Sequence, residues 1–179
     1  MKNTLLFLFL TCFVLISCKD SVEPEEENEL ITTVKLSFTT GGKTLVYSYK
    51  DLDGDGGKMP VIDKIVLSPN TEYLLSTEFL DESKTPTVSI TEEILAEAAE
   101  HLVFYTPSSA NLGTFTYSDK DKNGFNIGLK GIFKTNAVQN GSLKVQLRHQ
   151  PDVNGKRVKD GSITPGSDDL NVSFTLEIK

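Results

Sequence analysis

The sequence predicts a mainly β protein, an antiparallel immunoglobulin-like β-sandwich with one short helix. From residue 30 to the C-terminus, apolar and polar residues alternate along several short runs, which is typical of strands with one buried face. Turn-forming residues separate these runs, and the prolines beyond residue 30 fall between them, where no ladder hydrogen bond is lost. About seven to nine strands with this spacing favour two packed sheets.

The expected strands follow one another along the whole domain, with Gly, Pro, Asn and Asp between them. They lie at residues 31–39, 44–50, 64–67, 72–80, 101–106, 114–118, 126–135, 142–149 and 170–178. The turns lie at residues 41–42, 53–57, 69–70, 123–124 and 140–141 and at Gly155.

Residues 91–100 (TEEILAEAAE) interrupt the strand pattern and predict the single helix. Ser89 or Thr91 can serve as its N-cap, and Glu92 and Glu93 lie in the first turn, where the helix dipole favours negative charge. We expect about three turns, laid across a sheet or an open end of the sandwich.

Residues 1–17 predict a signal peptide. A basic start precedes the apolar run 4–16, which suits a secretory signal and is too short to cross a bilayer as a helix. The run ends in Leu-Ile-Ser-Cys (15–18), which resembles the lipobox of bacterial lipoproteins. We therefore expect Cys18 to carry lipid, including palmitate, as the first residue of the mature chain. Cys12 leaves with the signal peptide, so no thiol remains for a disulfide or a nucleophile.

Residues 18–29 are expected to tether the β-sandwich domain, residues 30–179, to the outer membrane. The stretch DSVEPEEENE (20–29) carries six carboxylates in ten residues and cannot pack into a core. The composition leaves open whether the domain faces the periplasm or the cell surface. The net charge of −7 and the pI of about 4.9 exclude nucleic acid as a partner, because phosphate binding needs a basic face.

Two loops share the spacing D-x-D-x-[DN]-G, which turns three side-chain oxygens toward one point. The oxygens belong to Asp51, Asp53 and Asp55 in the first loop and to Asp119, Asp121 and Asn123 in the second. Neither loop is an EF-hand, because Ile62 or Lys130 stands where that motif needs Glu. Two interpretations stay open: weak Ca²⁺ binding outside the cell, which two lysines disfavour in the second loop, or ordinary turn chemistry.

Three residues form a candidate site for a transition metal. Glu97 and His101 are spaced i, i+4 on the expected helix, and His149 ends the expected strand 142–149. Zinc, haem or another metal would use these side chains if the fold brings them together. The alternative interpretation is a solvated acidic helix face with one histidine paired to a glutamate and a second histidine at the surface.

The sequence holds no assembled catalytic group. Two histidines, no free cysteine and no G-x-S-x-G motif leave no candidate triad, and the absence of Trp removes the usual platform for a sugar. The paired carboxylates lie in turns and in the tether. We therefore expect a protein that is not an enzyme.

Several stretches resemble a family of small Bacteroidota lipoproteins over nearly all of the mature chain. Besides the Cys18 lipobox they are ELITTV (29–34), DLDGDG (51–56), FLDES (79–83), ITEEI (90–94), EHLVFY (100–105) and LRHQP (147–151). Members are often labelled as type 1 periplasmic binding fold proteins, but that fold needs two α/β lobes and the strand pattern does not fit it. The resemblance implies a companion of a TonB-dependent outer-membrane receptor.

Two functions from different classes are therefore expected. The first is a non-enzymatic accessory lipoprotein that binds a receptor or its cargo through loops at the end of the sandwich. The second is a lipoprotein that binds or delivers a metal or haem through Glu97, His101 and His149.

Overall fold

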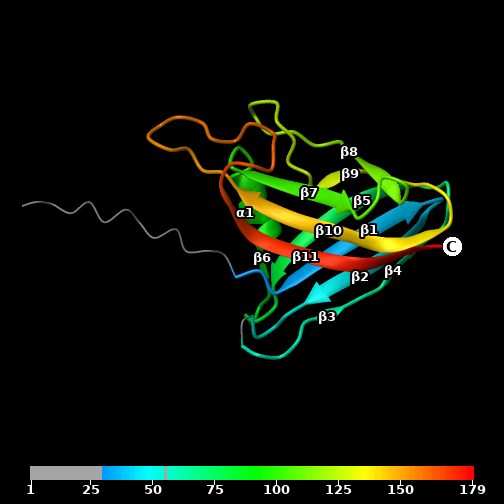
Figure 1. Ribbon diagram of the computed structural model, residues 1–179. Coiled ribbons are helices and arrows are strands. Elements are labelled where there is room, and N and C mark those ends of the chain that lie inside the picture. The colour runs from blue at the N-terminus through cyan, green and yellow to red at the C-terminus, as the bar shows by residue number, and fades with distance from the viewer. Residues whose placement is uncertain (1–29, 55) are drawn as a thin grey trace, which may run out of the picture.

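The computed structural model describes residues 30–54 and 56–179 (Figure 1). The expected signal peptide, Cys18, the acidic tether and Asp55 lie outside the described residues. Within these ranges, no helix combines the length and the apolar character that crossing a bilayer requires.

Two sheets form the protein, and the prediction of a mainly β sandwich with one short helix is confirmed. The seven-stranded sheet has the order β3-β2-β1-β5-β9-β8, with β6 added beside β5. Its members are β1 (Thr33–Thr40), β2 (Lys43–Lys50), β3 (Val61–Ile62), β5 (Glu72–Asp81), β6 (Val88–Ser89), β8 (Gly113–Tyr117) and β9 (Lys130–Thr135).

The four-stranded sheet has the order β4-β11-β10-β7. Its members are β4 (Ile65–Leu67), β7 (His101–Pro107), β10 (Gln139–His149) and β11 (Ser167–Ile178). The named strands pair antiparallel except for β4, which runs parallel to β11. The strands β3 and β6 were not expected, since two-residue strands are too short to show a period. The strand β4 was expected at residues 64–67, but its parallel pairing with β11 departs from the expected antiparallel arrangement.

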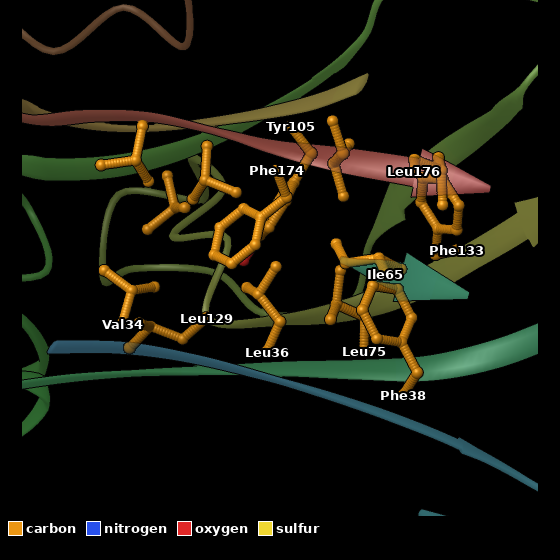
Figure 2. Close-up of a cluster of buried hydrophobic side chains, with 14 of the residues drawn as sticks. Val34, Leu36, Phe38, Ile65, Leu75, Tyr105, Leu129, Phe133, Phe174 and Leu176 are labelled. Carbon is orange, nitrogen blue, oxygen red and sulfur yellow. The ribbon is translucent and has the colours of Figure 1, made fainter. Parts of the chain in front are cut away.

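The core lies between the two sheets and is made by alternate residues of their strands (Figure 2). Val34, Leu36 and Phe38 of β1 face Phe174 and Leu176 of β11, and all five are fully buried. Burying each such side chain contributes roughly 1.5 to 3 kcal/mol to folding. The core is thus the direct consequence of the period of two.

The helix α1 (Ile90–Ala96) is shorter than expected, and the prediction that it reaches residue 100 is wrong. The Lys159 ammonium donates to the Ala98 carbonyl, and the Gln150 amide donates to the Glu100 carbonyl. These tertiary bonds hold the chain in a turn, so it leaves the helix and enters β7 at His101. Helix propensity is weak and is overridden by such contacts.

Two further expectations about strand ends are wrong. Residues 140–141 do not form a turn but lie inside β10, where a Cβ on Gly141 would meet the Leu112 side chain at 2.5 Å. Gly141 therefore lets the Leu112 side chain pack directly against the backbone of β10. The strand expected from residue 126 begins only at Lys130, because the carboxylate of Asp119 accepts the amides of Gly128 and Lys130 and fixes an irregular loop.

Candidate metal site

Two histidines meet at the end of the four-stranded sheet that lies beside α1 (Figure 1). His101 is the first residue of β7 and His149 the last of β10, and the two are direct partners in the antiparallel ladder. Opposed side chains in such a ladder are close neighbours. The rings accordingly stack, with their centroids 4.7 Å apart and their planes 4° from parallel. His101 is buried, whereas His149 is half-buried.

Glu97 is the third residue of the metal site that was expected from the sequence. It caps the C-terminus of α1 and its side chain is exposed. One ligand atom from each of Glu97, His101 and His149 lies within 4.8 Å of the others. The three residues come together, but the helical spacing that suggested Glu97 and His101 is not the reason, since α1 ends before both. Strand pairing places His149 beside His101 instead.

Two further acidic residues, Asp169 and Glu100, lie near the histidines, and Asp169 was not expected from the sequence. The Asp169 Oδ2 lies 3.7 Å from the His101 Nε2, and the Glu100 Oε2 lies 3.8 Å from the His149 Nε2. Asp169 precedes the strand expected at residues 170–178 as one of two consecutive aspartates. No local pattern tells which of them faces a histidine 68 residues earlier in the chain, so the sequence held no usable signal.

His101 is held in the neutral form that binds metals. Burial lowers its pKa to about 4, with further contributions from His149 and Lys159, against a hydrogen bond to Glu97 that acts in the opposite direction. His101 Nδ1 lies 3.2 Å from the Glu97 carbonyl oxygen. Because a carbonyl only accepts, Nδ1 carries the hydrogen and Nε2 keeps the lone pair. This arrangement, with one ring nitrogen bonded to a carbonyl and the other available, is typical of metal-ligating histidines.

The segment at residues 151–166 is tied down at the same end of the sandwich (orange in Figure 1). Gln150 Nε2 donates to the carbonyls of Ser162 and Pro165, and Arg148 donates to those of Pro165 and Gly166. These bonds fix the residues on both sides of His149, which limits the freedom of its backbone.

In the second calcium-like loop, the Lys159 ammonium occupies the place beside Asp121 that a cation would take. The Asp121 Oδ1 accepts the amides of Asn123 and Phe125, while its Oδ2 accepts the Lys159 ammonium at 2.9 Å. Burial alone would raise the pKa of Asp121, but these hydrogen bonds outweigh burial and hold the pKa below its usual range. A Ca²⁺ ion at Asp121 would have to displace Lys159, a residue that the sequence did not single out.

The first loop is held by its own backbone. The amides of Gly54 and Gly56 donate to the carbonyls of Asp51 and Asp53, and the Tyr49 hydroxyl donates to the Asp51 Oδ2 at 3.3 Å. These bonds are those of ordinary turns. Calcium binding at this loop stays a prediction, with Asp55 outside the described residues.

Comparison of the chain with protein-family models, with curated proteins and with solved structures gave no match.

Proposed function

We propose that this protein is a non-enzymatic, lipid-anchored module of the cell envelope that binds a divalent transition metal through Glu97, His101 and His149. The observation that carries the proposal is the pairing of two histidines across a strand ladder with a carboxylate beside them. Imidazole and carboxylate donors together suit Zn²⁺, Ni²⁺, Co²⁺ and Cu²⁺ better than Ca²⁺ or Mg²⁺. Of the two functions expected from the sequence, the cluster supports metal binding more directly.

The distances fit a site that tightens around its ion. Donors bound tetrahedrally to Zn²⁺ at about 2.0 to 2.1 Å lie roughly 3.4 Å from one another. The three donor atoms lie up to 4.8 Å apart, so the longest distance between two donors would have to shorten by at most about 1.4 Å on metal binding. Glu97 is exposed and His149 is half-buried, so both side chains can move toward the buried His101. We propose that His101 is the fixed donor of the three.

Metal binding is tested on the full-length protein in detergent after EDTA treatment. We expect calorimetric titration with Zn²⁺ or Ni²⁺ to give one ion per chain, and His101→Ala to weaken the affinity by at least about 100-fold, because it removes the fixed donor. Glu92→Gln, which removes an exposed carboxylate of α1 outside the cluster, is the matched control and should leave the affinity unchanged. Haem is titrated in parallel. Failure of the wild type to bind any of these ligands would contradict the proposal.

A second candidate function, docking on an outer-membrane receptor of the TonB-dependent type, is favoured by an apolar hollow on the seven-stranded sheet. Leu74 of β5 and Ile132 of β9 are direct ladder partners with exposed side chains, although alternation normally places polar residues on an outer face. They line the hollow together with Thr39, Thr40, Gly41, Gly42, Glu72 and Tyr73. Such exposed apolar patches are common at protein interfaces.

We further propose that Cys18 carries the lipid anchor, on the strength of the lipobox-like residues 15–18. Wild-type protein is expected to enter the detergent phase in a partitioning assay, because two or more acyl chains bind a membrane far more firmly than one. Cys18→Ala is expected to remain in the aqueous phase or in an unprocessed membrane form. Cys12→Ala is the matched control, since that cysteine belongs to the expected signal peptide. Equal partitioning of wild type and Cys18→Ala into the aqueous phase would refute the anchor.

A further inference from the structure

The four-stranded sheet is irregular at the end that carries the two histidines. In the β10–β11 ladder Leu147 pairs with Leu170, but Arg148 pairs with Asp168, so the register shifts by one residue. Asp169 is the extra residue of this β-bulge. Bulges re-aim a side chain and are frequent beside functional sites. Here the bulge directs Asp169 toward His101, and both side chains are more than nine-tenths buried.

We infer that the Asp169 carboxylate is the fourth donor of the metal site, so that two histidines and two carboxylates surround one Zn²⁺-like ion. The inference rests on the proposed function, because it adds a ligand to the same site. Four protein donors leave no open position for a reacting water, which is characteristic of sites that hold an ion rather than use it in catalysis. The donor set thus agrees with a protein that binds or delivers its metal.

The distance between Asp169 and His101 supports this role. Their closest atoms, Oδ2 and Nε2, are 3.7 Å apart, which is longer than a hydrogen bond of 2.7 to 3.2 Å. It is close to the separation of roughly 3.4 Å between two donors of one tetrahedral ion. Nε2 is also the nitrogen that keeps its lone pair, because Nδ1 faces the Glu97 carbonyl. The distance suits two donors of one ion. Asp169 is not among the three residues whose donor atoms all lie within 4.8 Å of one another, so on binding it would have to move toward the ion together with Glu97 and His149.

Charge balance gives a second argument. A divalent ion between Asp169, Glu97 and two neutral imidazoles yields a neutral site. Glu97 is exposed and His149 is half-buried, so both side chains have room to move toward the ion.

The test uses Zn²⁺ affinity in the full-length protein, measured by competition with a chromophoric chelator. We expect Asp169→Asn to weaken Zn²⁺ binding about 10- to 100-fold, because it keeps the shape but removes the charge. Asp168→Asn is the matched control: it alters the neighbouring aspartate, which pairs with Arg148, and should change the affinity less than about threefold. Equal affinities for wild type and Asp169→Asn would overturn the inference and leave the proposed function standing. Loss of binding in the wild type would overturn both.

A gain of signal provides a second readout that does not depend on lost affinity. Asp169→Cys places a thiolate at the inferred ligand position, and Co²⁺ bound by a thiolate shows an intense near-ultraviolet charge-transfer band that oxygen and nitrogen donors lack. We expect the band in Co²⁺-loaded Asp169→Cys and not in Co²⁺-loaded wild type or Asp168→Cys. Co²⁺ binding by Asp169→Cys without the band would show that residue 169 is not a ligand.

Discussion

Replacing Lys159 by methionine is expected to lower the free energy of unfolding by about 3 to 5 kcal/mol, the usual cost of breaking a buried ion pair by removing one partner. Lys159 and Asp121 have fully buried side chains. The ammonium donates to the Asp121 carboxylate at 2.9 Å and to the Ala98 carbonyl at 2.8 Å. Without it, Asp121 keeps two backbone amides but loses the only cation bonded to its carboxylate among the described residues.

Urea denaturation measures the effect. Lys156→Met is the matched control, since Lys156 lies in the same segment with an exposed side chain and should change the free energy by less than about 0.5 kcal/mol. Adding Asp121→Asn to Lys159→Met should recover part of the loss, because no uncompensated buried charge then remains. Breaking a buried ion pair usually costs at least about 3 kcal/mol. If the unfolding free energy of Lys159→Met lies within about 1 kcal/mol of the wild-type value, the pair contributes little to stability.

Acidification is expected to destabilise the metal-free protein through His101 by roughly 3 kcal/mol between pH 6.5 and pH 4, since each pH unit in this window contributes about 1.4 kcal/mol. The pKa of His101 falls from an ordinary 6.5 to about 4, chiefly because the ring is buried. In this window the unfolded chain binds a proton at His101 and the folded chain does not, so stability rises with pH. The contribution is therefore complete above pH 6.5 and is lost as the pH falls to 4.

The measurement compares unfolding free energies across this range for wild type and His101→Gln in the presence of a chelator. Carboxylates titrate in all variants, so only the difference between the two curves reports His101. His149→Gln is the control and should keep most of the wild-type slope, because burial of His101 is the larger cause of its lowered pKa. Parallel curves for wild type and His101→Gln would contradict the prediction.

The strands and the core could be predicted because alternation is a local property. Val34, Leu36 and Phe38 alternate with polar residues, and this alone assigns them to the buried face of β1. The end of α1 could not be predicted in the same way. Residues 97–100 retain helix-forming side chains, and bonds from Gln150 and Lys159, which lie 50 and 61 residues beyond the carbonyls they reach, end the helix.

Some residues of the candidate site could be predicted from the sequence and others could not. Glu97, His101 and His149 could be named from their chemistry, because imidazole and carboxylate groups bind metals wherever they occur. Asp169 could not be named, since the sequence holds many aspartates and only a bulge distinguishes this one. The burial of Lys159 could not be predicted for a related reason. A lysine in a polar segment is normally exposed, and only the structure shows that Lys159 pairs with the buried Asp121.

Local alternation and side-chain chemistry were enough to assign the residues that face the core, the positions of most strands and the groups that can bind a metal. The three-dimensional arrangement was needed to show that His101 and His149 are partners in one ladder, that Asp169 bulges toward them and that Lys159 fills the loop at Asp121. The physical reason is that side-chain direction along a strand follows from local geometry, whereas register depends on pairing between distant segments. A shift of one residue in that pairing would turn every side chain to the other face and separate the donors.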